Sequence, residues 1–343
     1  MSNKTILASA LCLFAASLAL NSFAQGNPPT SKASGEIATA ANKFLATLDD
    51  GQRGRVVFDF KDEAQRKRWS NLPATMFKRA GLRMGDLTKP QSDSVLAVLA
   101  AALSPQGYEK ILQIMQGDEV LRKTDGGGRV IFGREEYYIS FLGQPSTIEP
   151  WTIQFGGHHL GLNITLVGKQ GTLTPSHTGA QPAIYELEGK TVRPLGRETD
   201  KAFALISSLD EAQRKQAILG FQMHDLVLGP GRDGQMIQPE GIKGSDLTQK
   251  QREMLLDLAS EWTGIMHEAV AKAKMEELKQ HITETWFAWS GPTEKGSAAY
   301  FRIQGPTVII EYAPQRLGED PTKHIHTIYR DPTNDYGAKW RTR

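Results

Sequence analysis

The feature that most constrains the fold is a repetition within the chain. Residues 81–88 (GLRMGDLT) are similar to residues 241–248 (GIKGSDLT), and residues 48–53 (LDDGQR) are similar to residues 209–214 (LDEAQR). Further matches follow in the same order: Glu136 with Glu284, Gly143 with Gly291, and Gly157 with Gly305. Ordered matches in separate segments are typical of an internal duplication, in which each copy is one structural unit. The sequence therefore predicts two related halves.

The first half begins with a helical pattern and continues with a pattern typical of strands. Apolar side chains recur at helical spacing in residues 37–48 and 91–115. Aromatic and β-branched side chains then dominate residues 137–143 and 151–155, as they do in strands. The same order returns in the second half, where we expect one long helix over about residues 248–281 before further strands.

This order predicts an α+β fold that is internally duplicated, each half a helical unit followed by an antiparallel β unit. We expect a signal peptide over residues 1–24 and a flexible leader over residues 25–34. The first half is expected over residues 35–198 and the second over residues 199–343, with the two halves packed as one body.

The N-terminus has the pattern of a secretory signal peptide. Lys4 supplies a positive start, an apolar run extends from Ile6 to Leu20, and small residues precede a cleavage site near Ala24. The apolar run is shorter than a typical membrane span. Cys12 lies within this segment, so the mature chain offers neither disulfides nor thiolate ligands. We expect an exported protein, periplasmic or secreted, with no membrane span in the mature chain.

The charge balance and the absent motifs exclude several functional classes. The chain has 40 Lys and Arg against 38 Asp and Glu, a net charge of +2, so no basic field would attract nucleic acid. No P-loop, dinucleotide fingerprint, Gly-x-Ser-x-Gly elbow or His-Glu-x-x-His motif occurs. We therefore expect no nucleotide or flavin cofactor. The oligomeric state is not defined by these features.

Four of the eight histidines fall in two pairs. His324 and His326 lie in a predicted strand, where side chains two apart share one face, so one ion could bind both imidazoles. His158 and His159 follow two glycines where the apolar alternation shifts from odd to even positions. We expect a β-bulge there that turns one of them toward the first pair, His159 in preference to His158. Alternatively, both pairs are structural and hydrogen-bonded within a polar core.

Two other side chains are candidates for catalysis. Glu311 interrupts an apolar run, where a carboxylate is costly unless it is paired. It could be a metal ligand, a general base or the partner of a histidine, or it could face outward. Arg330 has the same strand parity as His324 and His326, so it could hold an anionic group in the same pocket.

The two histidine blocks also carry a family resemblance. Residues 151–160, 179–182 and 324–337, with their Gly-His-His and His-x-His blocks, resemble the domain-of-unknown-function 3500 family. The resemblance covers most of the mature chain. It implies that the two blocks belong to one unit, and it implies no particular activity.

Two functional hypotheses follow from these residues. The first is an exported metalloenzyme in which His324, His326 and one of the other histidine pair hold a divalent metal. Zinc would imply hydrolysis by metal-activated water, whereas copper or iron would imply oxidative chemistry. The second is a non-catalytic exported binding protein, in which the histidines and Arg330 hold a small anionic or peptide ligand between the halves.

Overall fold

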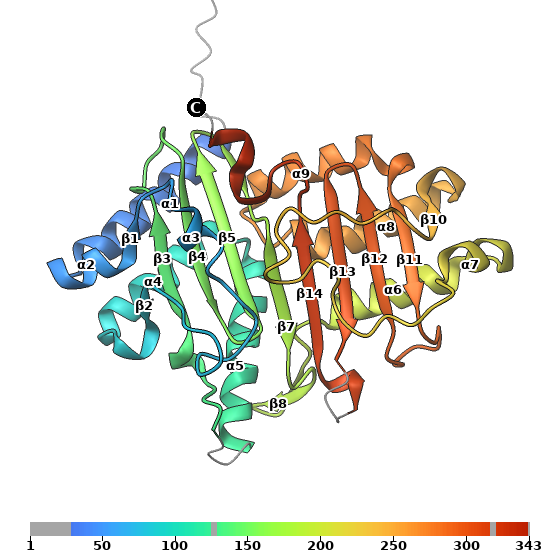
Figure 1. Cartoon of the computed structure of the whole chain (residues 1–343), viewed down its shortest axis with the longest axis horizontal. Coiled ribbons are helices and arrows are strands. Elements are labelled where there is room, and N and C mark those ends of the chain that lie inside the picture. The colour runs from blue at the N-terminus through green and yellow to red at the C-terminus, as the bar shows by residue number, and fades with distance from the viewer. Residues whose placement is uncertain (1–28, 125–128, 316–319, 342–343) are drawn as a thin grey trace, which may run out of the picture.

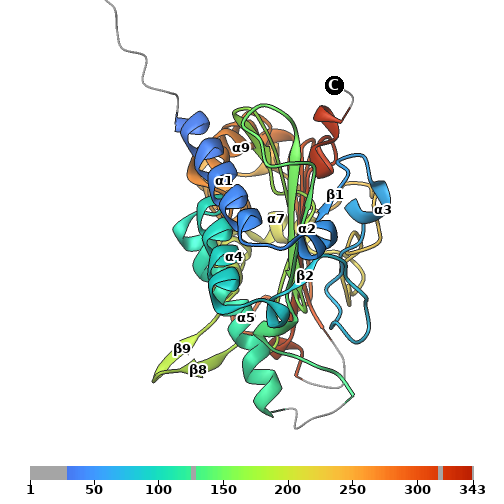
Figure 2. The same ribbon diagram turned by 90° about the vertical axis from the view of Figure 1, so that its left-hand side faces the viewer.

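The computed structural model describes residues 29–124, 129–315 and 320–341. One large mixed sheet runs through the protein, with helices on one face and loops on the other (Figures 1 and 2). The expected signal peptide, residues 1–24, lies outside the described residues. Within the part that is described, no helix combines the length and apolar character that crossing a membrane requires.

The sheet places strands of the two halves on opposite sides of a central seam. Along the sheet the strands are, in spatial order, β1 (Val57–Phe58), β3 (Tyr138–Leu142), β4 (Trp151–Gly157), β5 (Leu160–Val167), β7 (Ser176–Ala180), β14 (Ile325–Arg330), β13 (Val308–Pro314), β12 (Tyr300–Gly305), β11 (Trp286–Ser290) and β10 (Ile242–Lys243). Outside this path, β2 (Leu82–Arg83) pairs with β3, β6 (Gln170–Thr172) with β5, and β8 (Tyr185–Leu187) with β9 (Lys190–Val192). The antiparallel pairing of β7 with β14 forms the seam.

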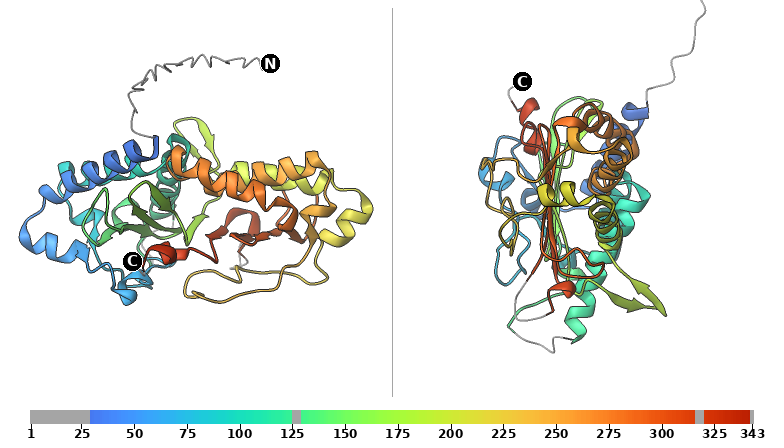
Figure 3. Two further views of the ribbon diagram at one scale, coloured as in Figure 1. Left: turned by 90° about the horizontal axis from the view of Figure 1, so that it is seen from above. Right: turned by 90° about the vertical axis from the view of Figure 1, so that its right-hand side faces the viewer.

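The longer helices cover one face of the sheet (Figure 3). They are α1 (Pro29–Ala46), α4 (Lys89–Ala102), α5 (Pro105–Thr124), α6 (Gly196–Ser208), α8 (Gln249–Thr263) and α9 (Glu268–Gln280). Two short helices, α2 (Asp50–Val56) and α7 (Glu211–Ala217), lie at opposite edges of the sheet. The other face is covered by loops, one of which contains α3 (Glu63–Arg66).

Alternation along the strands explains why the two faces are covered differently. Ile153 and Ile164 are partners in β4 and β5 and belong to the apolar core under the helices. Their neighbours Gln154 and Asn163 point to the loop face, where they hydrogen bond to each other at 2.9 Å. Gln65 of α3 donates to Gln154 at 2.9 Å, so the loop layer satisfies the buried amides. The loop face is thus buried and polar, which suits it to hold histidines.

The same local structures occur in both halves. Thr88 and Thr248 begin α4 and α8 with a capping box, and α2 and α7 also begin with one. Gly81 and Gly241 have φ values of 100° and 95°, and at each a Cβ atom would lie 2.2 Å from a carbonyl oxygen of the adjacent strand. Only glycine fits there. β1 pairs in parallel with β3, and the residue after α7 forms a parallel bridge with β11.

The prediction of a β-bulge at His158 and His159 is wrong. β4 and β5 form a hairpin with Gly157 opposite Leu160, and His158 and His159 are the two residues of its turn. In this register odd positions of β4 pair with even positions of β5. The tight turn alone therefore produces the shift in alternation.

Two helix boundaries also differ from expectation. The long helix expected over about residues 248–281 is broken after Thr263, because Ile265 and Met266 leave the helical path and pack into the core of the first half. The leader expected over residues 25–34 is helical from Pro29, where α1 begins.

Candidate metal centre

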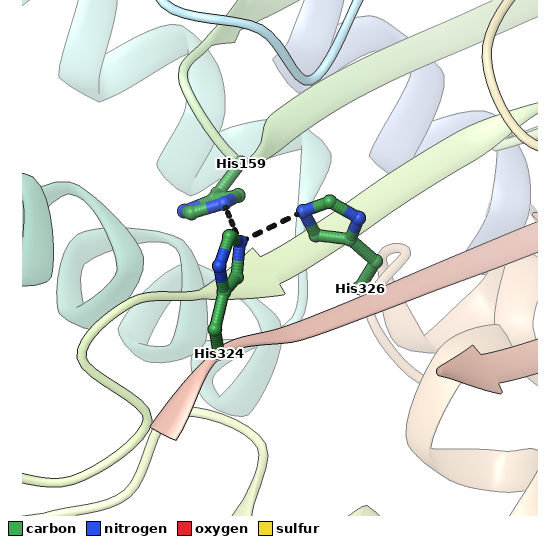
Figure 4. A group of neighbouring side chains, drawn as sticks. All are labelled: His159, His324 and His326. Carbon is green, nitrogen blue, oxygen red and sulfur yellow. Dashed lines mark hydrogen bonds between the residues drawn. The ribbon is translucent and has the colours of Figure 1, made fainter. Parts of the chain in front are cut away.

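The two histidine pairs come together beside the seam, where the β4–β5 turn approaches the start of β14. His324 is the C-cap of a short 3-10 helix, η5 (Pro321–Lys323), and His326 lies two residues later in β14. His159 reaches them from the β4–β5 turn, and Figure 4 shows its ring beside those of His324 and His326. The structure therefore brings together three of the residues expected to bind metal, from segments far apart in the chain.

The backbone of His159 is held in an unusual conformation. Its φ is 59°, in the left-handed region, which costs a non-glycine residue about 1–2 kcal/mol. Its N–H donates to Asn71 O at 3.0 Å, and its carbonyl accepts from Gly179 N at 2.7 Å. A Cβ atom at Gly179 would lie 3.1 Å from His159 Cβ, so glycine leaves room for the imidazole. Strain of this kind concentrates at functional sites.

Three imidazole nitrogens converge in this cluster. Nε2 of His324 lies 2.9 Å from Nε2 of His159 and 3.1 Å from Nε2 of His326. One ligand atom from each of the three residues falls within 4.8 Å of the others. Two nitrogens bound at ~2.1 Å to one tetrahedral ion would be about 3.4 Å apart. A small adjustment of the rings would therefore let one ion bind all three.

Hydrogen bonding alone does not satisfy this arrangement. A neutral imidazole has one N–H donor and one acceptor nitrogen, yet Nε2 of His324 contacts two other Nε2 atoms. Whether that nitrogen donates or accepts, the two contacts share a single proton or a single lone pair. Nδ1 of His159 and Nδ1 of His324 are also buried without a hydrogen-bond partner among the described residues.

Burial keeps these imidazoles neutral. Only 1% of His159, 3% of His324 and 7% of His326 is exposed. Desolvation, with the neighbouring histidines, lowers the pKa of His159 far below its ordinary value and that of His324 to about 3. The pKa of His326 is also lowered, chiefly by desolvation. At neutral pH each ring is therefore uncharged and has a lone pair available for a metal ion.

The outer side of the cluster is polar. Oδ1 of Asp225 lies 3.7 Å from Nδ1 of His326, and the Asn71 amide lies 3.5 Å from the same ring. Gln315 donates to Asp225 at 2.9 Å and fixes the carboxylate. A carboxylate near the second nitrogen of a histidine ligand orients the ring and raises its basicity.

His158 contacts a different set of residues. Its Nδ1 donates to Oδ1 of Asp118 in α5 at 2.8 Å, and its ring lies against that of His159, with centroids 3.6 Å apart and the planes tilted by 34°. The hydroxyl of Tyr137 lies 2.9 Å from Oδ2 of Asp118. Sequence reasoning missed Asp118. The available signal was its position on the inward stripe of α5, one turn after Ile114.

His177 is a second residue that sequence reasoning did not assign to the site. It lies in β7 opposite Ile328, its ring centroid is 5.3 Å from that of His326, and it is fully buried. Neither of its ring nitrogens has a partner within the described part of the chain. Burial lowers its pKa far below the ordinary value. Five of the eight histidines thus gather in one region.

Glu311 is on the same face of the sheet but holds a loop. It is fully buried, and its two carboxylate oxygens accept from Val227 N at 2.9 Å and Leu228 N at 2.7 Å. Tyr300 also donates to Glu311 at 2.7 Å. The carboxylate is therefore committed to three donors, and no contact joins it to the histidine cluster in the described structure.

Arg330 holds the same loop. Its guanidinium donates to Leu228 O at 2.7 Å and Gly229 O at 3.1 Å, and it pairs with Asp233 at 3.0 Å and Asp335 at 2.8 Å. The strand parity of Arg330 correctly predicts that it lies on the same face of the sheet as His326. However, these partners use its hydrogen-bond donors. The structure does not bring Arg330 to the three converging nitrogens.

The fold and the cluster define an α+β protein whose buried histidines could hold a metal ion. The chain belongs to the family described as "Protein of unknown function (DUF3500)", whose model matches residues 30–338. The expected family resemblance is thereby confirmed. Comparisons with curated proteins and with solved structures gave no match.

Proposed function

We propose that this chain is an exported protein that binds a transition-metal ion through His159, His324 and His326. The observation that supports this most is the convergence of three buried Nε2 atoms whose contacts exceed what hydrogen bonding can satisfy. Neutral imidazoles suit zinc, copper and iron, and three protein ligands leave a fourth position for water or a substrate atom. Zinc there would support hydrolysis, and copper or iron would support oxidation.

In this proposal Glu311 and Arg330 serve the site indirectly. Both fasten the loop over residues 219–240, which also carries Asp225 beside His326. Their expected catalytic roles are replaced by positioning of this loop.

A second candidate function is non-catalytic metal storage or structural metal binding. The observation that favours it is the burial of the cluster, since every proposed ligand is at most 7% exposed. Azide binding to the copper-loaded protein separates the two functions. A shift of the copper spectrum would mean that a small molecule reaches the ion, as catalysis requires, and an unchanged spectrum would favour storage.

We also infer that the two halves arose by duplication. The repeated capping boxes, the paired glycines with positive φ and the matching strand order support this inference. The turn of the β12–β13 hairpin, residues 306–307, then corresponds to His158 and His159. The histidine pair would be an addition to one copy only.

Export is part of the proposal and rests on the N-terminal pattern alone. Expression of the full chain with its own N-terminus, followed by sequencing of the mature protein, tests it. A first residue at Gln25 is the expected result. Retention of residues 1–24 in the mature protein would contradict it.

Metal analysis of the purified mature protein tests the binding site. We expect a metal to copurify, or to be taken up from zinc or copper solution, and to be lost in a His324→Ala/His326→Ala double variant. His281→Ala is the matched control, because His281 lies at the end of α9 and contacts Glu284 instead of the cluster. Equal metal content in the double variant and the native chain would remove the proposal.

A further inference from the structure

A second group of potential ligands adjoins the three converging histidines. Asp118, His158 and His159 each offer a ligand atom within 4.8 Å of the others. They are 1%, 6% and 1% exposed. The two groups share His159, so the candidate metal centre continues from the sheet toward α5.

No Lys or Arg side chain of the described residues contacts the carboxylate of Asp118. Among the described residues its hydrogen-bond partners are the His158 ring and the Tyr137 hydroxyl. The nearby guanidinium of Arg79 donates to four backbone carbonyls, those of Ser70, Leu72, Phe77 and Gly157. A buried carboxylate without a counter-charge is costly. A metal ion would supply the missing positive charge.

The two ring nitrogens of His159 differ in their contacts. Nε2 faces His324, whereas Nδ1 is buried and has no hydrogen-bond partner in the described structure. Its ring lies against His158, with the two planes at 34°. An imidazole nitrogen without a partner, a buried carboxylate and a second imidazole together form a donor set typical of a divalent transition metal.

We propose that Asp118, His158 and Nδ1 of His159 bind a second divalent ion, so that His159 bridges two ions. This proposal rests on the proposed function, because the first ion occupies Nε2 of the same ring. Filling both positions removes the ring proton of His159 to solvent and leaves a bridging imidazolate. Nδ1 of His158 also becomes a ligand, and its proton moves to Nε2 of that ring. The chemical class is an ion that prefers nitrogen and carboxylate ligands, zinc or copper(II).

Metal stoichiometry tests this proposal separately from the first site. The metal-free full mature chain is titrated with zinc and the bound ions per chain are counted. Two ions per chain are expected, and Asp118→Asn should reduce the count to one. One ion in both proteins would overturn the second site while leaving the first. No bound ion would overturn the proposed function itself.

A matched control lies at the next position of α5. Glu119 is a carboxylate that pairs with Arg122 near the surface, so Glu119→Gln should keep the native count of two ions. A loss in Glu119→Gln equal to that in Asp118→Asn would show a general effect on α5 and would overturn the assignment of Asp118 as a ligand.

The native chain also gives a direct readout that needs no folded variant. Two copper(II) ions bridged by one imidazolate couple magnetically, so the low-temperature electron spin resonance intensity should fall below that of two isolated ions. A signal that grows in proportion to added copper up to two equivalents would overturn the bridge.

Discussion

Nε2 of His159 and Nε2 of His324 lie 2.9 Å apart although 165 residues separate them in the chain. Neither residue can reach the other until the β4–β5 hairpin and β14 have both joined β7. The site is therefore a product of the completed sheet. Variants that disturb the seam should affect metal binding as well as stability.

Gly179→Ala tests this dependence. The new Cβ atom would lie 2.9 Å from Ile325 O and 3.1 Å from His159 Cβ, so β14 or the hairpin must move. We expect a loss of about 1–3 kcal/mol in the free energy of unfolding, together with weaker metal binding. Denaturant unfolding and zinc titration measure both.

Gly54→Ala serves as the control for this variant, since its Cβ would meet nothing within 4 Å in helix α2. It should leave both properties unchanged or raise stability slightly. Gly179→Ala behaving like Gly54→Ala would argue against the tight packing of His159.

The metal-free protein should lose stability in mild acid. Burial lowers the pKa of His159 and His177 far below 6.5, whereas the same histidines in the unfolded chain take up protons near pH 6.5. The unfolded state then binds more protons, so the free energy of unfolding falls as the pH drops below that value. For each histidine that stays neutral in the folded state, the free energy of unfolding then falls by up to about 1.4 kcal/mol per pH unit.

Urea unfolding in the presence of a chelator, from pH 7.5 to pH 5, measures this dependence. A His177→Leu variant should show a shallower fall, because it has one fewer buried imidazole. Equal stability at pH 7.5 and pH 5 would mean that these rings are already protonated or exposed.

Glu311→Gln should loosen the loop that crosses the sheet. The amide of the substituted side chain offers one acceptor oxygen in place of two, so one of the N–H groups of Val227 and Leu228 loses its partner. A cost of about 1–3 kcal/mol is expected, with faster proteolysis within residues 219–240. Limited proteolysis followed by mass spectrometry locates the cuts.

The same variant separates positioning from ligation. Metal should still bind, since Glu311 has no contact with the three histidines in the described structure. Complete loss of metal binding by a Glu311→Gln variant that still folds would indicate that Glu311 is a metal ligand.

Asp225→Asn should weaken metal binding without abolishing it. Asp225 lies 3.7 Å from Nδ1 of His326, so its charge raises the basicity of the ring. Loss of such a carboxylate typically reduces metal affinity by about 10- to 100-fold. Competition with a chromogenic chelator measures the change, and an affinity equal to that of the native chain would exclude Asp225 from this role.

Local patterns were sufficient to anticipate part of the site. The two-residue spacing of His324 and His326 predicts their common face. His324 lies directly before β14 instead of within it, but its backbone is extended, so side-chain direction still alternates. The preference for His159 over His158 also agrees with the observed geometry, although a hairpin turn rather than a bulge aims the ring. The helix-then-strand order was enough to predict a mixed α and β architecture.

The remaining features depend on contacts between distant segments. Asp118 lies on α5 and His177 on β7, and nothing in their neighbouring residues reveals that β7 lies between β5 and β14. The strand parity of Arg330 was enough to predict the face of the sheet on which it lies. The loop over residues 219–240 that binds its guanidinium has no periodic sequence pattern, so this contact was not predicted. Such tertiary pairings lie beyond any single local pattern.

The β7–β14 ladder has a practical consequence. A chain cut before α6 would give two fragments, each with a bare strand edge where the other belongs, and such edges recruit foreign strands. Made together, the fragments would be complementary, and each would carry only part of the histidine cluster. Recovery of metal binding would then show that the two fragments have associated. The fold could therefore serve as the basis of a split-protein sensor.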